Sequence, residues 1–190
     1  MNTLEFKGVS KRFRQIVIAD NMDLAIRSNT FSVIFGAPAS GKSTLLRLIT
    51  GLERPDRGDI LIDGKIVNKM EPGERNIGYV PQSFALYPHY SVFDNIAYPL
   101  KLLGVAKGDY TPIVESTAEQ LQITHLLNKR PDQCSGGEKQ RVAIARGIVK
   151  NTKIFILDDP LTGLDFKLRE RLFDDLRVMR DQLQATFIYT

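Results

Sequence analysis

Residues 31–43 read Phe-Ser-Val-Ile-Phe-Gly-Ala-Pro-Ala-Ser-Gly-Lys-Ser, so a glycine-rich loop directly follows a short apolar run. The run Phe31–Phe35 is typical of a buried strand in a parallel sheet. A helical pattern continues from Ser43 to Thr50, and Gly51 marks its expected end. A loop of this kind between a strand and a helix predicts an α/β fold with an anion site, because backbone N–H groups and the positive helix end face the same point.

The spacing of the glycines, the lysine and the serine indicates which anion this loop binds. Lys42 supplies a point charge for the β and γ phosphates of a nucleoside triphosphate, and Ser43 offers a hydroxyl group to Mg²⁺. The alternative is a glycine-rich turn with an incidental lysine, which the strand and helix on either side disfavour. The predicted ATP-binding residues of the loop are Gly36, Ala37, Pro38, Ala39, Ser40, Gly41, Lys42, Ser43 and Thr44.

A second apolar run, residues 154–157, is followed by the pair Asp158-Asp159. Ligands of open α/β sheets bind beyond the carboxyl ends of parallel strands, where such a pair would lie. Asp158 is predicted to serve the Mg²⁺ ion. Asp159 is predicted to orient or deprotonate a water molecule as the catalytic base. The alternative is a strand that ends in an ordinary polar turn.

The sequence Ser135-Gly136-Gly137-Glu138 supports two compatible interpretations. Its Ser-x-x-Glu form is that of a capping box at the start of a helix. A helix N-terminus with a serine hydroxyl and two glycines is also suited to bind an anion. Ser135 can therefore cap its helix when no nucleotide is bound.

Composition limits the broad class of the protein. The 190 residues are 43% hydrophobic and 25% charged, as in ordinary globular proteins, and a net charge of +4 gives no case for nucleic acid as a partner. The single cysteine excludes an internal disulfide, and the sequence has neither a run of transmembrane length nor a signal peptide. These features predict a cytoplasmic protein.

Strand and helix patterns alternate along the chain in a way that predicts its organisation. Residues 1–90 and 151–190 are expected to form the α/β core, with an antiparallel β portion at the N-terminal end. Residues 91–150 have a helical pattern and are expected to form an inserted subdomain. The chain ends inside a strand-like run, so the C-terminal part of the core is expected to be truncated.

Taken in order, these motifs resemble the ATP-binding subunits of ATP-binding-cassette (ABC) transporters over nearly the whole chain. The resemblance implies a P-loop core in which Phe13 stacks on adenine. It also implies that Gln82 senses the γ phosphate, contributes to catalysis and helps to hold Mg²⁺. In this family two subunits join head to tail, so the residues expected to act on the partner's ATP are Ser135, Gly136, Gly137 and Asp165.

A finer resemblance, over Pro72–Gln82 and Ala85–Ile96, is to importers of maltodextrins, glycerol phosphate and related solutes. It implies a homodimer or a related ATPase partner, integral membrane permease subunits, an indirectly coupled solute-binding protein, and a position on the inner face of the membrane. The permease is expected to contact Tyr87, Pro88, His89 and Tyr90. The alternative for this segment is an exposed loop with packed aromatic side chains.

Two departures from the family pattern bear on turnover. Asp159 stands where the family usually has glutamate, and a carboxylate displaced by about 1 Å can cost on the order of a hundredfold in rate. The family's switch histidine would follow Thr190, where the chain stops. These departures favour one rival function, a nucleotide-binding regulatory module with little turnover. A second rival is a soluble ABC ATPase of DNA repair or translation, against which the continuous resemblance over Pro72–Leu100 argues.

Overall fold

The structure is a computed structural model, and it describes residues 2–159 and 166–190. The described chain forms two compact units. The first contains the residues up to Ile77 together with Lys153–Asp158 and Arg177–Thr190. The second contains Gly78–Thr152 and Asp159–Leu176.

Three short strands of the first unit pair in parallel and confirm the α/β class predicted from the sequence. β8 (Thr186–Tyr189) lies between β3 (Phe31–Val33) and β7 (Ile154–Leu157). The register aligns Phe31, Phe187 and Phe155, and the rings of Phe155 and Phe187 stack with their centroids 5.0 Å apart. All four residues of β7 are buried, as its continuous apolar sequence predicts.

The apolar run before the glycine loop differs from the prediction at its end. The strand stops at Val33, and Phe35, expected in a buried strand, is 97% exposed. The N–H of Ile34 donates the last sheet hydrogen bond, to the carbonyl of Tyr189 at 2.8 Å. Beyond that bond the backbone leaves the sheet for the loop, so Phe35 has no neighbouring strand to cover it.

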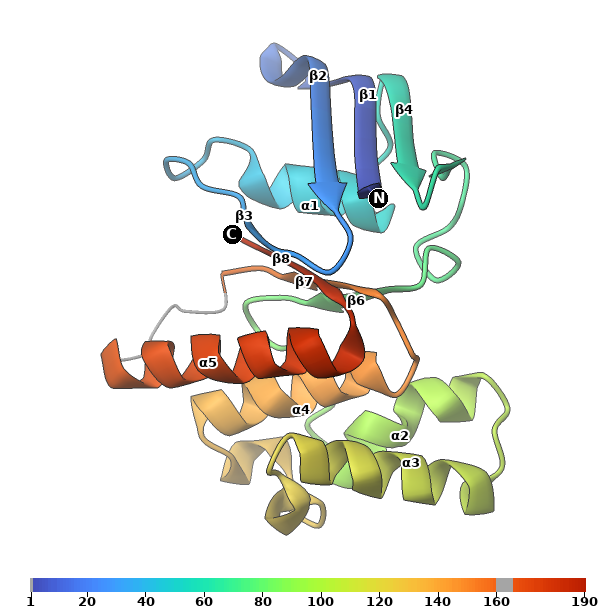
Figure 1. The fold of residues 1–190 in the computed structure, drawn as a ribbon, viewed down its shortest axis with the longest axis vertical. Coiled ribbons are helices and arrows are strands. Elements are labelled where there is room, and N and C mark those ends of the chain that lie inside the picture. Colours follow the sequence, from blue (N-terminus) through green and yellow to red (C-terminus); the bar gives the residue numbers. More distant parts are fainter. Residues whose placement is uncertain (1, 160–165) are drawn as a thin grey trace. The chain divides into compact units, whose positions relative to one another are not determined.

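The predicted antiparallel β portion is present in the same unit. Figure 1 shows β2 (Ile16–Arg27), β1 (Asn2–Phe13) and β4 (Arg57–Ile62) side by side, and β5 (Lys65–Ile66) completes the order β2-β1-β4-β5. Asp63 and Gly64, between β4 and β5, have φ angles of 48° and 75°. Such a pair of positive angles forms the tight turn that an Asp-Gly sequence favours.

The helix after the glycine loop is α1 (Lys42–Thr50), which begins one residue earlier than predicted and ends at Gly51 in the left-handed conformation. Leu46, Leu48 and Ile49 are fully buried on its inner face. A glycine at this C-terminal position is the residue that adopts a positive φ without a steric cost. The predicted end of the helix is therefore confirmed.

Helices dominate the second unit. α4 (Gly136–Ile148) packs against α2 (Val92–Leu102) and α3 (Lys107–Gln120), as Figure 1 shows in green to orange. Two short 3₁₀ turns, Thr124–Leu126 and Pro131–Gln133, connect α3 to α4. The three helices fall within the range 91–150 expected for the helical subdomain; the domain boundaries themselves stay a prediction.

Two elements have residues in both units, β6 (Ile77–Val80) and α5 (Phe166–Leu183). Within the described ranges, no helix has both the length and the apolar character needed to cross a membrane.

Candidate nucleotide-binding site

Two glycines of the loop lie close to neighbouring side chains, and one of them has a backbone conformation that favours glycine. A β carbon on Gly36 would lie 2.7 Å from the Ser40 hydroxyl oxygen. Gly41 has a φ of 96°, and a β carbon there would lie 2.7 Å from Cγ2 of Ile18. Ala39 also has a positive φ, 62°. The loop therefore turns tightly, and its shape depends on glycine at position 41, whereas the Ser40 hydroxyl could rotate away from a β carbon at position 36.

The start of α1 is built to receive an anion. The first backbone N–H groups of a helix have no acceptor within the helix, and here the first bond runs from Leu45 N–H to Gly41 at 2.9 Å. Among the described residues, no side chain caps this end, and Ser43 is exposed. The uncapped N–H groups and the helix dipole together favour negative charge at this point.

Lys42 bends back over the loop that precedes it. Its ammonium group donates hydrogen bonds to the carbonyl oxygens of Gly36, at 3.0 Å, and Ala37, at 2.9 Å. These are neutral acceptors, which bind a cation less strongly than a charged oxygen does. The lysine is thus held beside the loop by contacts that a phosphate group can replace.

A cavity of about 160 Å³ adjoins the loop. Ile18, Ala19 and Met22 of β2 line one side, and Lys42 and Leu45 of α1 line another. The cavity is mainly apolar, with the lysine as its charged group. An apolar wall that continues from a phosphate-binding loop is suited to a ligand with both anionic and apolar parts.

Phe13 lies at the end of β1, where the β1–β2 hairpin turns. It pairs with Ile16, and the two side chains are 40% and 65% exposed, respectively. The ammonium group of Lys11 lies 5.0 Å from the centroid of the Phe13 ring. Phe13 is thus too exposed to be a residue of the hydrophobic core.

Asp158 lies directly after β7, in the same unit as the glycine loop. Its carboxylate accepts a hydrogen bond from the Thr190 hydroxyl at 3.1 Å. The described residues contain no cluster of three or more acidic, histidine or cysteine side chains that could hold a metal by themselves. Mg²⁺ is usually bound by one or two carboxylates together with substrate phosphates, so a carboxylate and the Ser43 hydroxyl fit this ion in the presence of a nucleotide.

The second unit brings together the two residues predicted to act in catalysis. Gln82 donates a hydrogen bond from its amide nitrogen to a carboxylate oxygen of Asp159 at 3.2 Å. Asp159 has a φ of 50°, in the left-handed region that a non-glycine residue seldom adopts. Such angles at a functional residue are held by their surroundings, and the bond to Gln82 is one such restraint.

The predicted capping box at Ser135 is confirmed. The Ser135 hydroxyl accepts from the N–H of Glu138 at 3.3 Å, and the Glu138 carboxylate accepts from the N–H of Ser135 at 2.7 Å. The latter bond holds the pKa of Glu138 below its ordinary value. α4 begins at Gly136, with Gly137 in its first turn, and a β carbon on Gly136 would have nothing within 4 Å. Asp165, which is expected to act on the partner's ATP together with these residues, lies outside the described residues.

The segment expected to contact a permease forms an exposed aromatic surface. Tyr87, Pro88, His89 and Tyr90 are all exposed. The rings of Tyr87 and Tyr90 lie 5.4 Å apart, and each also contacts Tyr98 of α2. Both interpretations of this segment thus have support, because the loop is exposed and its aromatic rings pack on one another.

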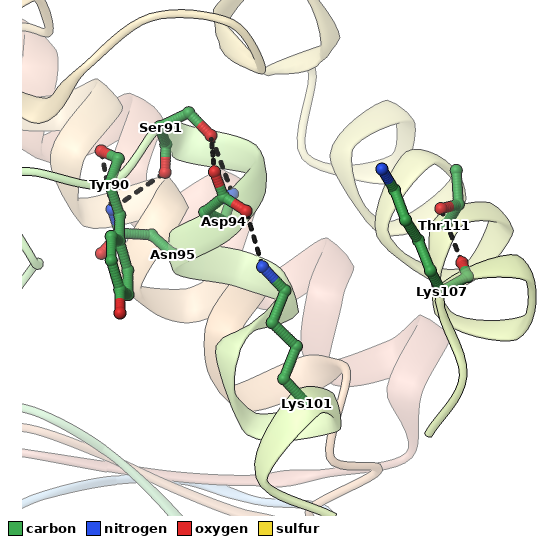
Figure 2. A network of polar contacts seen from close by, with 7 residues as sticks. All are labelled: Tyr90, Ser91, Asp94, Asn95, Lys101, Lys107 and Thr111. Atoms are coloured by element: carbon green, nitrogen blue, oxygen red, sulfur yellow. Dashed lines mark hydrogen bonds and ion pairs between the residues drawn. The ribbon is translucent and has the colours of Figure 1, made fainter. Parts of the chain in front are cut away.

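The sequence interpretation missed Asn95, whose side chain is hydrogen-bonded to the backbone of the loop that forms this aromatic surface. Its fully buried amide accepts from Tyr87 N–H at 2.8 Å and donates to the carbonyls of Tyr87, Tyr90 and Ser91. Figure 2 shows Asn95 beside Tyr90 and Ser91 at the start of α2. A polar residue among the buried positions of an apolar helix face was the signal that could have identified it.

Arg146 of α4 was also missed. Its guanidinium donates to the carbonyls of Ala85, at 2.6 Å, and Phe84, at 3.1 Å, and lies 5.7 Å from the Tyr87 ring. Phe84 and Ala85 have φ angles of 60° and 46°. The arginine therefore stabilises a strained stretch between Gln82 and the aromatic surface.

The parallel sheet, the glycine loop and the uncapped helix behind it define a P-loop α/β domain. The profile of the ABC transporter family matches residues 19–162. The chain belongs to the ABC transporter family.

Curated relatives match along the entire chain. The sn-glycerol-3-phosphate import ATP-binding protein UgpC of Bordetella avium is 43% identical over 190 residues, which are 100% of this chain and 53% of the relative. The maltose/maltodextrin import ATP-binding protein MalK of Photorhabdus laumondii is 42% identical over 189 residues, 51% of its length. The chain thus spans about half the length of these curated relatives.

Solved structures share the fold. cbiO1 of Clostridium perfringens, part of the ABC transporter complex cbiONQ, superposes with a TM-score of 0.92 at 26% identity over 99% of this chain and 77% of that one. An ATP-binding cassette of an ABC transporter in its ADP conformation superposes with a TM-score of 0.86 at 24% identity, over 100% of this chain and 80% of its own.

Proposed function

We propose that this chain binds and hydrolyses ATP as a subunit of an ABC importer, and that it couples ATP-driven dimer closure to the entry of a carbohydrate or polyol. The observation that carries the proposal is the match, over the whole of this chain and about half of each relative, to import ATP-binding proteins for sn-glycerol-3-phosphate and maltose/maltodextrin. The anion-binding loop and the Gln82–Asp159 pair supply groups that such a function needs.

In this proposal the phosphates of ATP bind at the glycine loop. Lys42 exchanges the carbonyl oxygens of Gly36 and Ala37 for the β and γ phosphates, which are stronger acceptors because they carry charge. The N–H groups at the start of α1 bind the same phosphates. The adenine base stacks on Phe13, whose ring is exposed at the hairpin turn.

Ser43, Asp158 and Gln82 are the residues that would hold Mg²⁺. When bound, the ion would neutralise charge on the phosphate oxygens. Asp159 accepts a proton from the attacking water, and Gln82 orients that water and Asp159. The hydrogen bond between Gln82 and Asp159 supports these roles, because it fixes the carboxylate of the proposed base.

The functional unit in this proposal is a dimer with an identical or related subunit. Ser135, Gly136, Gly137 and Asp165 of one subunit contact the ATP held by the other subunit's glycine loop. Because Ser135 satisfies its hydroxyl within its own helix, it caps α4 until a phosphate arrives. A single copy therefore binds ATP and hydrolyses it slowly.

The partners follow from the same assignment. A permease in the membrane contacts the surface of Tyr87, Pro88, His89 and Tyr90, which places the chain on the cytoplasmic face. A solute-binding protein acts through the permease, and nucleic acid has no part. The exposed aromatic rings support a protein contact, because tyrosine is enriched where protein interfaces are buried.

Two measurements test the proposal. Lys42→Ala should weaken ATP binding by at least about tenfold, the loss of one charge-assisted contact, while Lys65→Ala on β5 leaves it unchanged. The tagged protein should co-purify from membranes with integral membrane permease subunits. Co-purification with ribosomes or DNA instead would support the soluble ABC ATPase.

One observation favours the second candidate, a nucleotide-binding regulatory module with little turnover. Asp159 is a short carboxylate, and one of its oxygens accepts from Gln82. ATP-driven dimerisation without phosphate release would support this alternative. Phosphate release at a rate of about 1 s⁻¹ or more, in the usual range of enzymes, would contradict it.

A further inference from the structure

The hairpin turn that carries Phe13 is anchored to the segment that follows α1. Lys11, two residues before Phe13 on β1, is only 7% exposed. Its ammonium group contacts Glu53 at 2.8 Å, the carbonyl of Arg54 at 2.9 Å and Asp56 at 3.3 Å. An ammonium group has three N–H donors, so these contacts use all of them and fix the cation in place.

The anchor is reinforced by main-chain contacts. Asp56 accepts the N–H of Arg12 at 2.7 Å and donates its own N–H to the carbonyl of Ser10 at 2.9 Å. Burial alone would lower the pKa of Lys11, but the hydrogen bonds from Lys11 to Glu53 and Asp56 raise it above the ordinary value. The side chain therefore remains a cation throughout the neutral range.

The fixed cation lies over one ring. Lys11 Nζ is 5.0 Å from the centroid of Phe13, within the range of a cation–π interaction. Without it, an aromatic side chain that is 40% exposed at a hairpin turn has little to hold its ring. With it, one face of the ring is occupied, and the orientation of the other face is set.

The same strand pair leads from this ring to the glycine loop. Phe13 pairs with Ile16. Ile18, two residues further along β2, would touch a β carbon at Gly41 and lines the cavity beside Lys42. Two residues of a strand span about 7 Å. A ligand with its phosphates on the loop could thus reach the Phe13 ring along β2.

We infer that Lys11 is a positioning residue for the base of the bound nucleotide: it holds the Phe13 ring in place for a purine to stack on, and it ties that ring to α1 through the 53–56 segment. The inference rests on the proposed function and adds a residue to it. Holding the ring before binding reduces the ordering cost that the nucleotide would otherwise meet.

Substitution of Lys11 should therefore weaken binding of the base and leave binding of the phosphates unchanged. The test compares the binding of magnesium ATP with that of magnesium inorganic triphosphate, by calorimetry on the full chain. Lys11→Met should weaken ATP binding about three- to tenfold, as expected for one lost cation–π contact, and triphosphate binding by less than about twofold. Lys11→Gln keeps two N–H donors without the charge and should act in the same direction.

Lys7→Met is the matched control, because Lys7 lies on the same strand with a 61% exposed side chain. It should change neither affinity. In a chain that already carries Phe13→Ala, Lys11→Met should add less than about twofold to the loss of ATP affinity, since its target ring is gone. A general structural role would instead reduce both affinities in either background.

The outcomes separate the two proposals. If Phe13→Ala selectively weakens ATP binding but both Lys11 variants do not, stacking of the base on Phe13 is supported and the role of Lys11 is wrong. If Phe13→Ala leaves the ratio of ATP to triphosphate affinity unchanged, the base does not stack on Phe13, and the proposed role of Lys11 is wrong as well. Equal losses of both ligands in the Lys11 variants would also overturn the inference.

Discussion

The amide of Gln82 and the carboxylate of Asp159 are joined by a 3.2 Å hydrogen bond, although 77 positions separate them in the sequence. The amide nitrogen is the donor and a carboxylate oxygen is the acceptor, so the bond holds the Asp159 side chain in one orientation. A general base must be held within hydrogen-bond reach of the proton that it removes.

Asp159 should therefore control turnover more than binding. Asp159→Asn removes the base and should lower the ATPase rate by about a hundredfold or more, with ATP affinity within about twofold. Asp159→Glu extends the carboxylate by one methylene and should change the rate more than the affinity. The control is Asp109→Asn, in an exposed turn of α3. An unchanged rate in both Asp159 variants would show that this residue is not the base.

The two serine caps of the second unit allow a matched test of the action of Ser135 on a partner's ATP. Ser135 caps α4, and Ser91 caps α2 by the same contact, a bond from the N–H three residues later. Ser135→Ala and Ser91→Ala should each cost about 1 kcal/mol of stability. Only Ser135→Ala should also weaken ATP-driven dimerisation, measured by sedimentation, with monomer ATP binding nearly unchanged. A loss of monomer binding would contradict the assignment to the partner's ATP.

Asn95 should be critical for the aromatic surface. Its side chain makes four hydrogen bonds to the backbone of Tyr87, Tyr90 and Ser91, all on the loop that presents the tyrosines. Asn95→Ala removes all four of these bonds from a fully buried position and should lower the free energy of unfolding by about 2–4 kcal/mol. The exposed Asn128 gives the control. A loss below about 0.5 kcal/mol in urea titrations would mean that water replaces the amide.

The network in Figure 2 also predicts a pH dependence. The hydrogen bond from Lys101, at 2.6 Å, and that from Ser91 hold the pKa of Asp94 below its ordinary value of 3.8. A lowered folded-state pKa means that the stabilisation is complete above the ordinary value and is lost as the pH falls through the folded one. Since Asp94 and Lys101 are about 40% exposed, the effect should be below about 1 kcal/mol.

Lys101→Met should accordingly flatten the fall in stability below pH 4, measured as the urea midpoint of unfolding. The circular dichroism spectrum of the folded protein should change little. Nearby Lys107 also lowers the pKa of Asp94 and is retained in this variant. An identical pH profile in the variant and the parent chain would contradict the role of the pair.

Features set by neighbouring residues were predictable from the sequence. The Ser135–Glu138 capping box and the Gly51 helix end each depend on a few adjacent positions, and each was found. The glycine loop was predictable for the same reason, because the spacing of its glycines, lysine and serine indicates a tight loop before a helix. Short-range rules of capping and turn conformation were sufficient for these parts of the site.

Lys11 and Arg146 were missed because their contacts join distant positions of the chain. Lys11 meets Arg54 and Asp56, which lie 43 and 45 residues away. Arg146 meets Ala85, which lies 61 residues away. No local pattern identifies such partners, because a lysine on a strand and an arginine on a helix are ordinarily solvated. The exposure of Phe35 has the same origin, since it depends on where the neighbouring strand ends.

The glycine loop gives the most direct test of the phosphate site. Gly41 has a φ of 96°, and a β carbon there would meet Ile18 at 2.7 Å. Gly41→Ala should therefore cost about 1–3 kcal/mol through backbone strain and overlap with Ile18. It should also weaken ATP binding by more than about tenfold, because the N–H groups of the following helix turn away from the phosphates.

Gly73→Ala is the control for Gly41, since a β carbon on Gly73 has nothing within 4 Å and its backbone needs no positive φ. It should leave stability and ATP affinity within experimental error. Ile18→Ala added to Gly41→Ala removes the overlap but keeps the backbone strain, so it should restore only part of the stability. If Gly41→Ala bound ATP as tightly as the parent chain, the loop conformation would not be what selects the phosphates, and the nucleotide site would have to lie elsewhere.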